Sequence, residues 1–260
     1  MRIWAISDLH LALGVDKPMH VFGEHWREHH HRIAAAWDAA VEADDLVLLP
    51  GDLSWATKPH EVAPDFAWLA DRPGEKVLIK GNHDYWWPTS QAKLASLLPP
   101  RTHALKKRAC RIAGCGCFGA RGGDFAPLTV YGDKRSQADI DRALDKEERE
   151  LRLSLEQLAA LEADPTLDGP GNGLRLCLFH YPPIPAGRRA SRFTPIIAAS
   201  GAALCVYGHL HGAGTEIERV EGHIGGVDYR CTSCDLVGFA PVLLRDLAAA
   251  PSGGDPAIPA

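Results

Sequence analysis

Five short polar motifs occur at intervals along this chain, and each follows a run of apolar residues. In chain order the motifs are Asp8-Leu9-His10, Gly51-Asp52, Gly81-Asn82-His83-Asp84, His180 and Gly208-His209-Leu210-His211. A short apolar run is typical of a buried strand, so each motif is expected where a strand ends. Helical patterns separate the runs, and strands that alternate with helices predict an α/β fold. The carboxyl edge of such a sheet is a natural crevice, where the motifs would meet.

Seven residues of these motifs are of the types that bind metals. They are Asp8, His10, Asp52, Asn82, His180, His209 and His211. A mixture of carboxylate, imidazole and amide donors suits two borderline divalent cations better than one structural zinc ion. Each residue alone has an ordinary explanation, such as a buried histidine, a turn asparagine or an aspartate that caps a helix. All seven together favour a metal site.

The order of the motifs, from residue 3 to about residue 213, resembles the calcineurin-like metallophosphoesterase superfamily. Residues 15–87 are also similar to a bacterial group of predicted phosphohydrolases within it, through the segments 16–19, 22–26 and 84–87. The resemblance implies a four-layer α/β/β/α sandwich, in which two mixed sheets are flanked by helices. We expect a single domain over residues 1–246 and a flexible C-terminal tail over residues 247–260, which is rich in Gly, Pro and Ala.

The same resemblance implies how the cations are held. Asp52 would bridge two divalent ions (manganese, iron or zinc) because its two carboxylate oxygens can bind separate cations. The first ion would also take Asp8, His10 and His211, and the second ion Asn82, His180 and His209. A metal-bound hydroxide would then attack phosphorus in line.

Two further residues of the third motif are given roles. His83 is expected to stabilise the transition state or to act as a general acid for the leaving group. Asp84 is expected to orient a histidine or a backbone turn rather than to bind a metal. In phosphoprotein phosphatases of the superfamily the second motif reads Gly-Asp-x-x-Asp, but this chain has Trp55 at the last position. That difference argues against a phosphoprotein substrate, and it predicts an apolar pocket wall at Trp55.

Substrate contacts are predicted less directly. The best candidates are His25 and Arg121. Lys17, in the same segment as His25, could also touch substrate, although a structural loop explains this segment equally well. Trp86 and Trp87 are expected to pack in the core. The arginines of residues 188–192 could hold a phosphate, and a charged surface loop explains them equally well. Two other polar clusters have plainer explanations than ligand binding: a solvated helix face for residues 29–31, and buried thiols rather than a zinc site for residues 115, 117, 231 and 234.

The favoured function is a phosphomonoesterase or phosphodiesterase acting on a small phosphorylated metabolite or nucleotide. The alternatives are a metal-dependent nuclease, a lipid-precursor pyrophosphatase and a non-catalytic scaffold of the same fold. The net charge of −5 does not favour nucleic acid. The pyrophosphatases replace the His of the Asn-His motif by Arg, whereas this chain keeps His83. A scaffold would not need all seven ligands.

The remaining expectations concern location and local structure. Seven cysteines, the absence of a long apolar run and a first motif at Asp8 predict a cytoplasmic protein without a membrane span, and they leave the oligomeric state open. Strands are expected over residues 2–7, 46–49, 76–79, 110–118, 174–179 and 204–207, helices over 27–41, 60–70, 89–98 and 137–163, a glycine-rich loop over 119–134, and a hairpin from 215–220 and 224–230.

Overall fold

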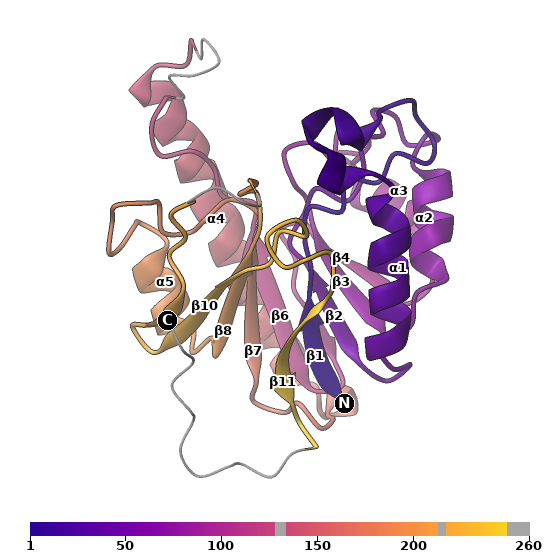
Figure 1. Ribbon diagram of the computed structural model, residues 1–260. Helices are drawn as coiled ribbons and strands as arrows, with labels where there is room; N and C mark the ends of the chain where they lie inside the picture. The colour runs from indigo at the N-terminus through magenta and orange to yellow at the C-terminus, as the bar shows by residue number, and fades with distance from the viewer. Residues whose placement is uncertain (128–133, 213–216, 249–260) are drawn as a thin grey trace.

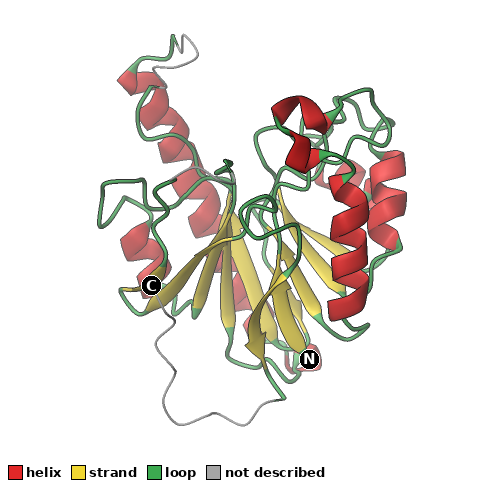
Figure 2. Cartoon of the chain, in the orientation of Figure 1, coloured by secondary structure: helices red, strands yellow, loops and turns green. Residues whose placement is uncertain are grey.

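The computed structural model describes residues 1–127, 134–212 and 217–248. Two mixed sheets lie face to face, and helices cover the outer side of each sheet (Figure 2). This confirms the four-layer α/β/β/α sandwich predicted from the sequence. No helix in the described ranges is both long and apolar enough to cross a membrane.

The first sheet has the strand order β11-β1-β2-β3-β4. Its strands are β1 (Arg2–Ala5), β2 (Leu46–Leu49), β3 (Glu75–Ile79), β4 (Thr102–Leu105) and β11 (Val242–Asp246). Strands β1 to β4 are parallel, and β11 is antiparallel to β1. The carboxyl ends of four consecutive parallel strands therefore share one edge of this sheet.

The second sheet has the strand order β5-β6-β7-β8-β10-β9. Its strands are β5 (Cys110–Ile112), β6 (Cys115–Ala120), β7 (Arg175–Phe179), β8 (Leu204–Tyr207), β9 (Gly222–Ile224) and β10 (Val227–Cys231). Strands β6, β7, β8 and β10 are parallel, and each edge is closed by an antiparallel hairpin partner. Here too the parallel strands end at one edge.

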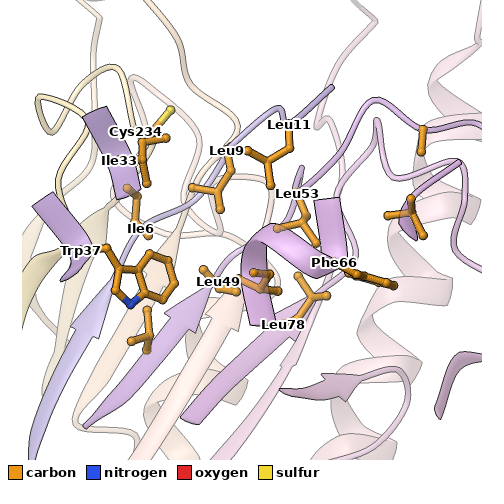
Figure 3. Packing of buried hydrophobic residues seen from close by; sticks show 14 of the residues in the cluster. Ile6, Leu9, Leu11, Ile33, Trp37, Leu49, Leu53, Phe66, Leu78 and Cys234 are labelled. Atoms are coloured by element: carbon orange, nitrogen blue, oxygen red, sulfur yellow. The ribbon is translucent and has the colours of Figure 1, made fainter. Parts of the chain in front are cut away.

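The helices divide between the two outer faces (Figure 1). They are α1 (His29–Ala40), α2 (Ala63–Ala70), α3 (Gln91–Leu97), α4 (Gln137–Glu162) and α5 (Thr194–Ala199), with short 3-10 helices η1 (Met19–Phe22), η2 (Glu24–Trp26) and η3 (Pro165–Leu167). Helices α1 to α3 pack on the first sheet, and α4 and α5 pack on the second. Figure 3 shows Trp37 of α1 and Phe66 of α2 against Leu49 and Leu78 of the strands.

A third core lies between the sheets. Successive side chains of a strand point to opposite faces, so Leu46 and Leu48 of β2 face the second sheet while Val47 and Leu49 face the helices. All four are at most 1% exposed. Burying one such side chain contributes roughly 1.5–3 kcal/mol. The layers thus make a rigid base for the loops at the carboxyl edge.

Three expectations about local structure were wrong. The strand expected over residues 110–118 is the hairpin β5/β6, because Ala113 and Gly114 have positive φ (48° and 86°) and turn the chain. The C-terminal hairpin is β9/β10, and both of its strands begin later than the expected residues 215 and 224. Residues 215 and 216 lie outside the described ranges. Strand β11 was not expected at all. The loop expected from residue 119 begins after Ala120, and residues 128–133 of it lie outside the described ranges.

Candidate metal centre

The seven candidate ligands come together at the carboxyl edge. Asp8 and His10 follow β1, Asp52 follows β2, Asn82 follows β3, His180 follows β7, and His209 and His211 follow β8. Strands β1, β2 and β3 are neighbours in the first sheet, and β7 and β8 are neighbours in the second. The ligands of both sheets therefore meet across the gap between the two layers.

One group of donors contains Asp8, His10 and His211. Their potential ligand atoms all lie within 4.8 Å of one another. The Nε2 atoms of His10 and His211 are 3.0 Å apart, and Nε2 of His211 is 3.5 Å from Oδ1 of Asp8. Two imidazole nitrogens and a carboxylate oxygen that point at one another are arranged as the ligands of a cation would be.

A second group forms around Asn82. Its Oδ1 lies 2.6 Å from Nε2 of His180 and 2.9 Å from Nδ1 of His209. Oδ2 of Asp52 is 3.6 Å from Nε2 of His180 and 3.9 Å from Nε2 of His10. The Asp52 carboxylate thus lies between the two groups. Ligand atoms of Asp8, Asp52 and His180 also fall within 4.8 Å of one another, so Asp8 is close to both.

The backbone at this edge is unusual. Asp8, His10, Asp52 and His209 all have positive φ, at 57°, 44°, 52° and 72°. Non-glycine residues rarely occupy this region, and such conformations cluster at functional sites. Four of the seven candidate ligands therefore leave their strands through a left-handed turn that aims the side chain across the edge.

Two motif glycines allow this close packing. A Cβ added at Gly81 would lie 2.0 Å from Oδ1 of Asp52, and one added at Gly208 would lie 2.2 Å from Oδ2 of Asp8. No side chain fits at either position, because carboxylate oxygens already fill the space. The glycine that precedes Asn82 and the one that precedes His209 are thus required by the carboxylates they touch.

Asp84 lies in the loop that follows β3 and is fully buried. Its carboxylate accepts backbone N–H groups from Asp52 (2.9 Å), Leu53 (3.0 Å) and Gly81 (2.7 Å). It also accepts the N–H of Ser54 and the indole N–H of Trp86. One buried side chain thus joins the loop that follows β2 to the loop that follows β3.

Asp235 is a residue that the sequence analysis missed. It is 5% exposed, and its Oδ1 lies 2.9 Å from Nδ1 of His211. A carboxylate in this position fixes the ring orientation of a histidine ligand. Ser233, from the same segment, donates to Oδ2 of Asp8 (3.1 Å). The segment follows β10, a parallel strand whose carboxyl end lies at the same edge. Its position after a strand could have marked Asp235 as a site residue.

Charge at the centre favours bound cations. Asp8, Asp52 and Asp84 are at most 1% exposed, and none of them pairs with a lysine or arginine in the part of the chain that is described. Burial and the nearby Asp8 carboxylate raise the pKa of Asp52 well above its usual range. Burial lowers the pKa of His211, but Asp235 and Asp8 outweigh it and raise the value to about 10. Buried carboxylates at such density are costly unless positive charge offsets them, so the donor set fits divalent metals.

His83 lies beside the two groups and lines the cavity above them. Its ring centroid is 4.2 Å from that of Trp55 and 5.6 Å from that of His10. Burial, together with the neighbouring His209, lowers the pKa of His83 to about 4. The ring is therefore neutral near pH 7, and nearby metal cations would hold it so. A neutral imidazole can still donate one hydrogen bond.

The cavity that opens over the centre has a volume of about 1210 Å³. His25, Lys17 and Trp55 line it, as the sequence analysis expected of residues near the site. Other lining residues that the sequence did not single out are Phe22, Tyr85, Asp124, Arg135 and Tyr181. The cavity is large enough for a drug-sized molecule and carries both aromatic and charged groups.

Arg121 does not line this cavity. Its guanidinium lies 3.6 Å from the carboxylate of Glu147 on α4, in a separate cavity of about 190 Å³. The backbone carbonyl of Arg121 instead accepts the N–H of His180 and of Tyr181. The side chain thus points away from the centre, although the backbone supports it.

The remaining polar clusters lie elsewhere. Trp86 and Trp87 are buried in the first core. Arg192 pairs with Glu148 of α4. His29 was expected on a solvated helix face, but it is buried. Its ring nitrogens lie within hydrogen-bond distance of the carbonyls of Trp26 and Leu9. The cysteines at residues 115, 117, 231 and 234 are free and buried.

Sequence comparison agrees with this fold. The model of the calcineurin-like phosphoesterases matches residues 1–213, so the chain belongs to the calcineurin-like phosphoesterase family. Two curated relatives are the Gene 66 proteins of Mycobacterium phages L5 and D29, which are 37% identical over 81 residues and 35% identical over 88 residues. The matches cover 31% and 32% of this chain, and the chain spans only 39% and 40% of the lengths of those proteins.

Two solved structures are also similar. A phosphopantetheinyl hydrolase from Mycobacterium tuberculosis gives a TM-score of 0.48 at 17% identity, over 96% of this chain and 98% of that one. A protein of unknown function from Aquifex aeolicus gives a TM-score of 0.45 at 12% identity, over 93% and 95% of the two chains.

Proposed function

We propose that this chain is a binuclear metal-dependent phosphoesterase that hydrolyses a small phosphorylated molecule. The observation that carries the proposal is the position of Asp52, whose Oδ2 lies 3.6 Å from His180 and 3.9 Å from His10, between the two groups of donors. A carboxylate in that position can be shared by two cations. Membership of the phosphoesterase family supports the same reading.

In this proposal one ion would be held by Asp8, His10 and His211, the other by Asn82, His180 and His209, and Asp52 would be shared by both. Manganese, iron and zinc all suit these donors. A pair of divalent cations, when bound, supplies the nucleophile at neutral pH and neutralises charge on the phosphoryl group. Asp235 and Asp84 act by orientation, since each holds a ligand or its loop in place.

His83 is assigned to the phosphoryl group or the leaving oxygen. It lines the cavity, and its backbone N–H donates to Oδ1 of Asp52 (2.8 Å), which fixes its position beside the proposed shared ligand. Because its pKa is lowered to about 4, the neutral ring would donate a hydrogen bond rather than a full proton from an imidazolium. Transition-state stabilisation is thus the favoured role.

The test is a hydrolysis panel with Mn²⁺, Fe²⁺, Zn²⁺, Ni²⁺ and Mg²⁺, using p-nitrophenyl phosphate and bis(p-nitrophenyl) phosphate. Metal content is measured in parallel, and two equivalents per chain are expected. Asp52→Asn should lower turnover by about a thousandfold, because it removes the shared ligand. Asp44→Asn is the matched control, since Asp44 is exposed at the opposite end of β2 and should not change the rate.

The outcomes separate the candidate functions. Turnover that survives Asp52→Asn would contradict a binuclear centre. Failure to bind any of the five metals would contradict the proposal as a whole and favour a scaffold. The ratio of the monoester and diester rates identifies the bond type.

A further inference from the structure

Lys17 occupies an unusual place in the cavity wall. Its ammonium nitrogen lies 4.3 Å from the centroid of the Trp55 ring, which is a cation–π contact. The same ring contacts His83 at 4.2 Å and is stacked on His10 at 5.0 Å. The Lys17 ammonium and the His83 ring contact the same indole ring, so they lie near each other. Trp55 thus contacts a positively charged side chain as well as two histidines of the candidate centre.

The Trp55 ring is held firmly in this position. Its indole N–H donates to the sulfur of Met19 (2.9 Å), and Met19 is buried. The ring of Phe22 lies parallel to it, with an interplanar angle of 8° and centroids 6.4 Å apart. Both residues belong to the segment that also carries Lys17, so the segment and the ring fix one another. A fixed ring presents the cation in one place before any ligand arrives.

No acidic side chain of the described ranges pairs with Lys17. Lys17 makes no ion pair within 4.0 Å in the ranges the structure describes, whereas Lys58 pairs with Glu61 at 3.9 Å. Arg135, the other lysine or arginine of the cavity wall, pairs with Asp124 at 2.8 Å. The adjacent carboxylate of Asp16 also lines the cavity, but it forms no such pair with Lys17. A cation without an internal partner in a cavity wall is suited to an anion from outside.

We propose that Lys17, seated on Trp55, binds a second anionic group of the ligand, so that the preferred substrates are phosphoesters that carry an additional phosphate or carboxylate. This inference rests on the proposed function, which places the first phosphoryl group at the metal centre. Because Lys17 and His83 contact the same indole ring, a short connecting chain suffices to join the two anionic groups. The aromatic rings of Trp55 and Phe22 would then flank the connecting part of the molecule.

Binding of three phosphonates tests this, because their C–P bonds are not hydrolysed by a phosphoesterase. Propylphosphonate carries one anionic group, phosphonobutyrate adds a carboxylate, and propylenediphosphonate adds a second phosphonate. Isothermal titration to the manganese-loaded protein should show that at least one of the two longer anions binds about tenfold tighter or more than propylphosphonate. The comparison between them tells which anionic group is preferred.

Variants of Lys17 give the sharpest contrast. Lys17→Met should remove the preference, and Lys17→Arg should keep most of it because the positive charge remains. Trp55→Leu should weaken the preference more than Trp55→Phe, which keeps an aromatic face. Lys58→Met is the matched control, since Lys58 is 66% exposed and does not line the cavity.

Several results would overturn the inference. These are equal binding of all three phosphonates by the wild type, binding of none of them, a preference that persists in Lys17→Met, and an equal loss in Lys58→Met. Hydrolysis of the chromogenic esters is measured on the same preparations. A wild type that shows the Lys17-dependent preference but no hydrolysis contradicts the proposed function alone. Hydrolysis without the preference contradicts this inference alone.

Discussion

The two sheets contribute different donors to the same centre. The first sheet supplies Asp8, Asp52 and Asn82, which offer oxygen atoms, together with His10. The second sheet supplies His180, His209 and His211, which are all imidazoles. A hard cation prefers oxygen, and a borderline cation accepts both kinds of donor. Each group of ligands contains residues from both sheets, so each proposed ion would have both oxygen and imidazole donors.

The two halves also hold their ligands differently. The loops of the first sheet are tied together by Asp84, which belongs to the same half. The histidines of the second sheet are oriented by groups outside their own loops: the carbonyl of Pro50 lies 3.0 Å from Nδ1 of His180, and Asp235 contacts His211. The first half is thus a frame built around one buried carboxylate. The second half has separate supports, so damage there should remain local.

The largest effect is expected from Asp84→Ala, which breaks the frame. Four backbone N–H groups and an indole N–H would lose their buried acceptor, which lowers the free energy of unfolding by about 3 kcal/mol or more. Urea unfolding measures this, and metal binding should fall at both ions. Asp65→Ala is the control: Asp65 is equally buried, but from the described residues it accepts just the Ser54 hydroxyl and the Leu13 N–H. Equal losses in the two variants would contradict the special role of Asp84.

His83→Ala is expected to lower kcat by about 100-fold or more, because it removes a group that acts on the transition state. The metal content and the melting temperature should stay near those of the wild type, since the His83 side chain is not among the proposed ligands. Turnover with p-nitrophenyl esters and metal analysis measure both. A loss of metal equal to the loss of rate would show that His83 supports the centre instead.

Asp235→Asn should affect one ion only. Removing the carboxylate that fixes His211 is expected to weaken binding of the first ion by about 10–100-fold. Stepwise metal titration should then show one weakened equivalent and one unchanged equivalent. Asp228→Asn is the control, because Asp228 contacts an exposed histidine, His223, away from the centre. Weakening of both equivalents would mean that the second half is as interdependent as the first.

The smallest effect is expected from Arg121→Met. The guanidinium lies outside the principal cavity and pairs with Glu147 at 3.6 Å, so kcat/KM should change by no more than about twofold. Because the Glu147 carboxylate is buried, the loss of its partner should lower the free energy of unfolding rather than the rate. A tenfold loss of kcat/KM at unchanged stability would show that this side chain reaches the substrate after all.

Much of the fold followed from the sequence because the strands that carry the motifs are buried on both faces. Such strands are uninterrupted apolar runs, as in β2 (Leu46–Leu49) and β8 (Leu204–Tyr207), and they are easily recognised. Strand β11 has no such pattern, since it lies at an edge, is partly exposed and ends in Arg245 and Asp246. The hairpin β5/β6 was merged into one strand because Gly114 alone marked the turn.

The candidate site was predicted unevenly for a related reason. Residues that stand directly after an apolar run, such as Asp52 and His180, are marked by their position. Asp235 lies beyond a strand that alternates buried and half-buried residues. It also follows Cys231 and Cys234, which suggested thiol chemistry instead. Local sequence does not determine the direction of a long side chain either. Arg121 follows a strand end like the ligands do, but its side chain turns towards α4.

Strand β11 has a consequence for the order in which the protein can be assembled. Its register places Asp246 opposite Arg2, so β1 receives its second neighbour only after nearly all of the described chain has been synthesised. The core between the sheets likewise joins Ile3 to Leu204 and Val206. Contacts so distant in sequence slow folding, because a long loop must close before they form. A growing chain would therefore carry its N-terminal ligands for most of synthesis without a finished sheet to hold them.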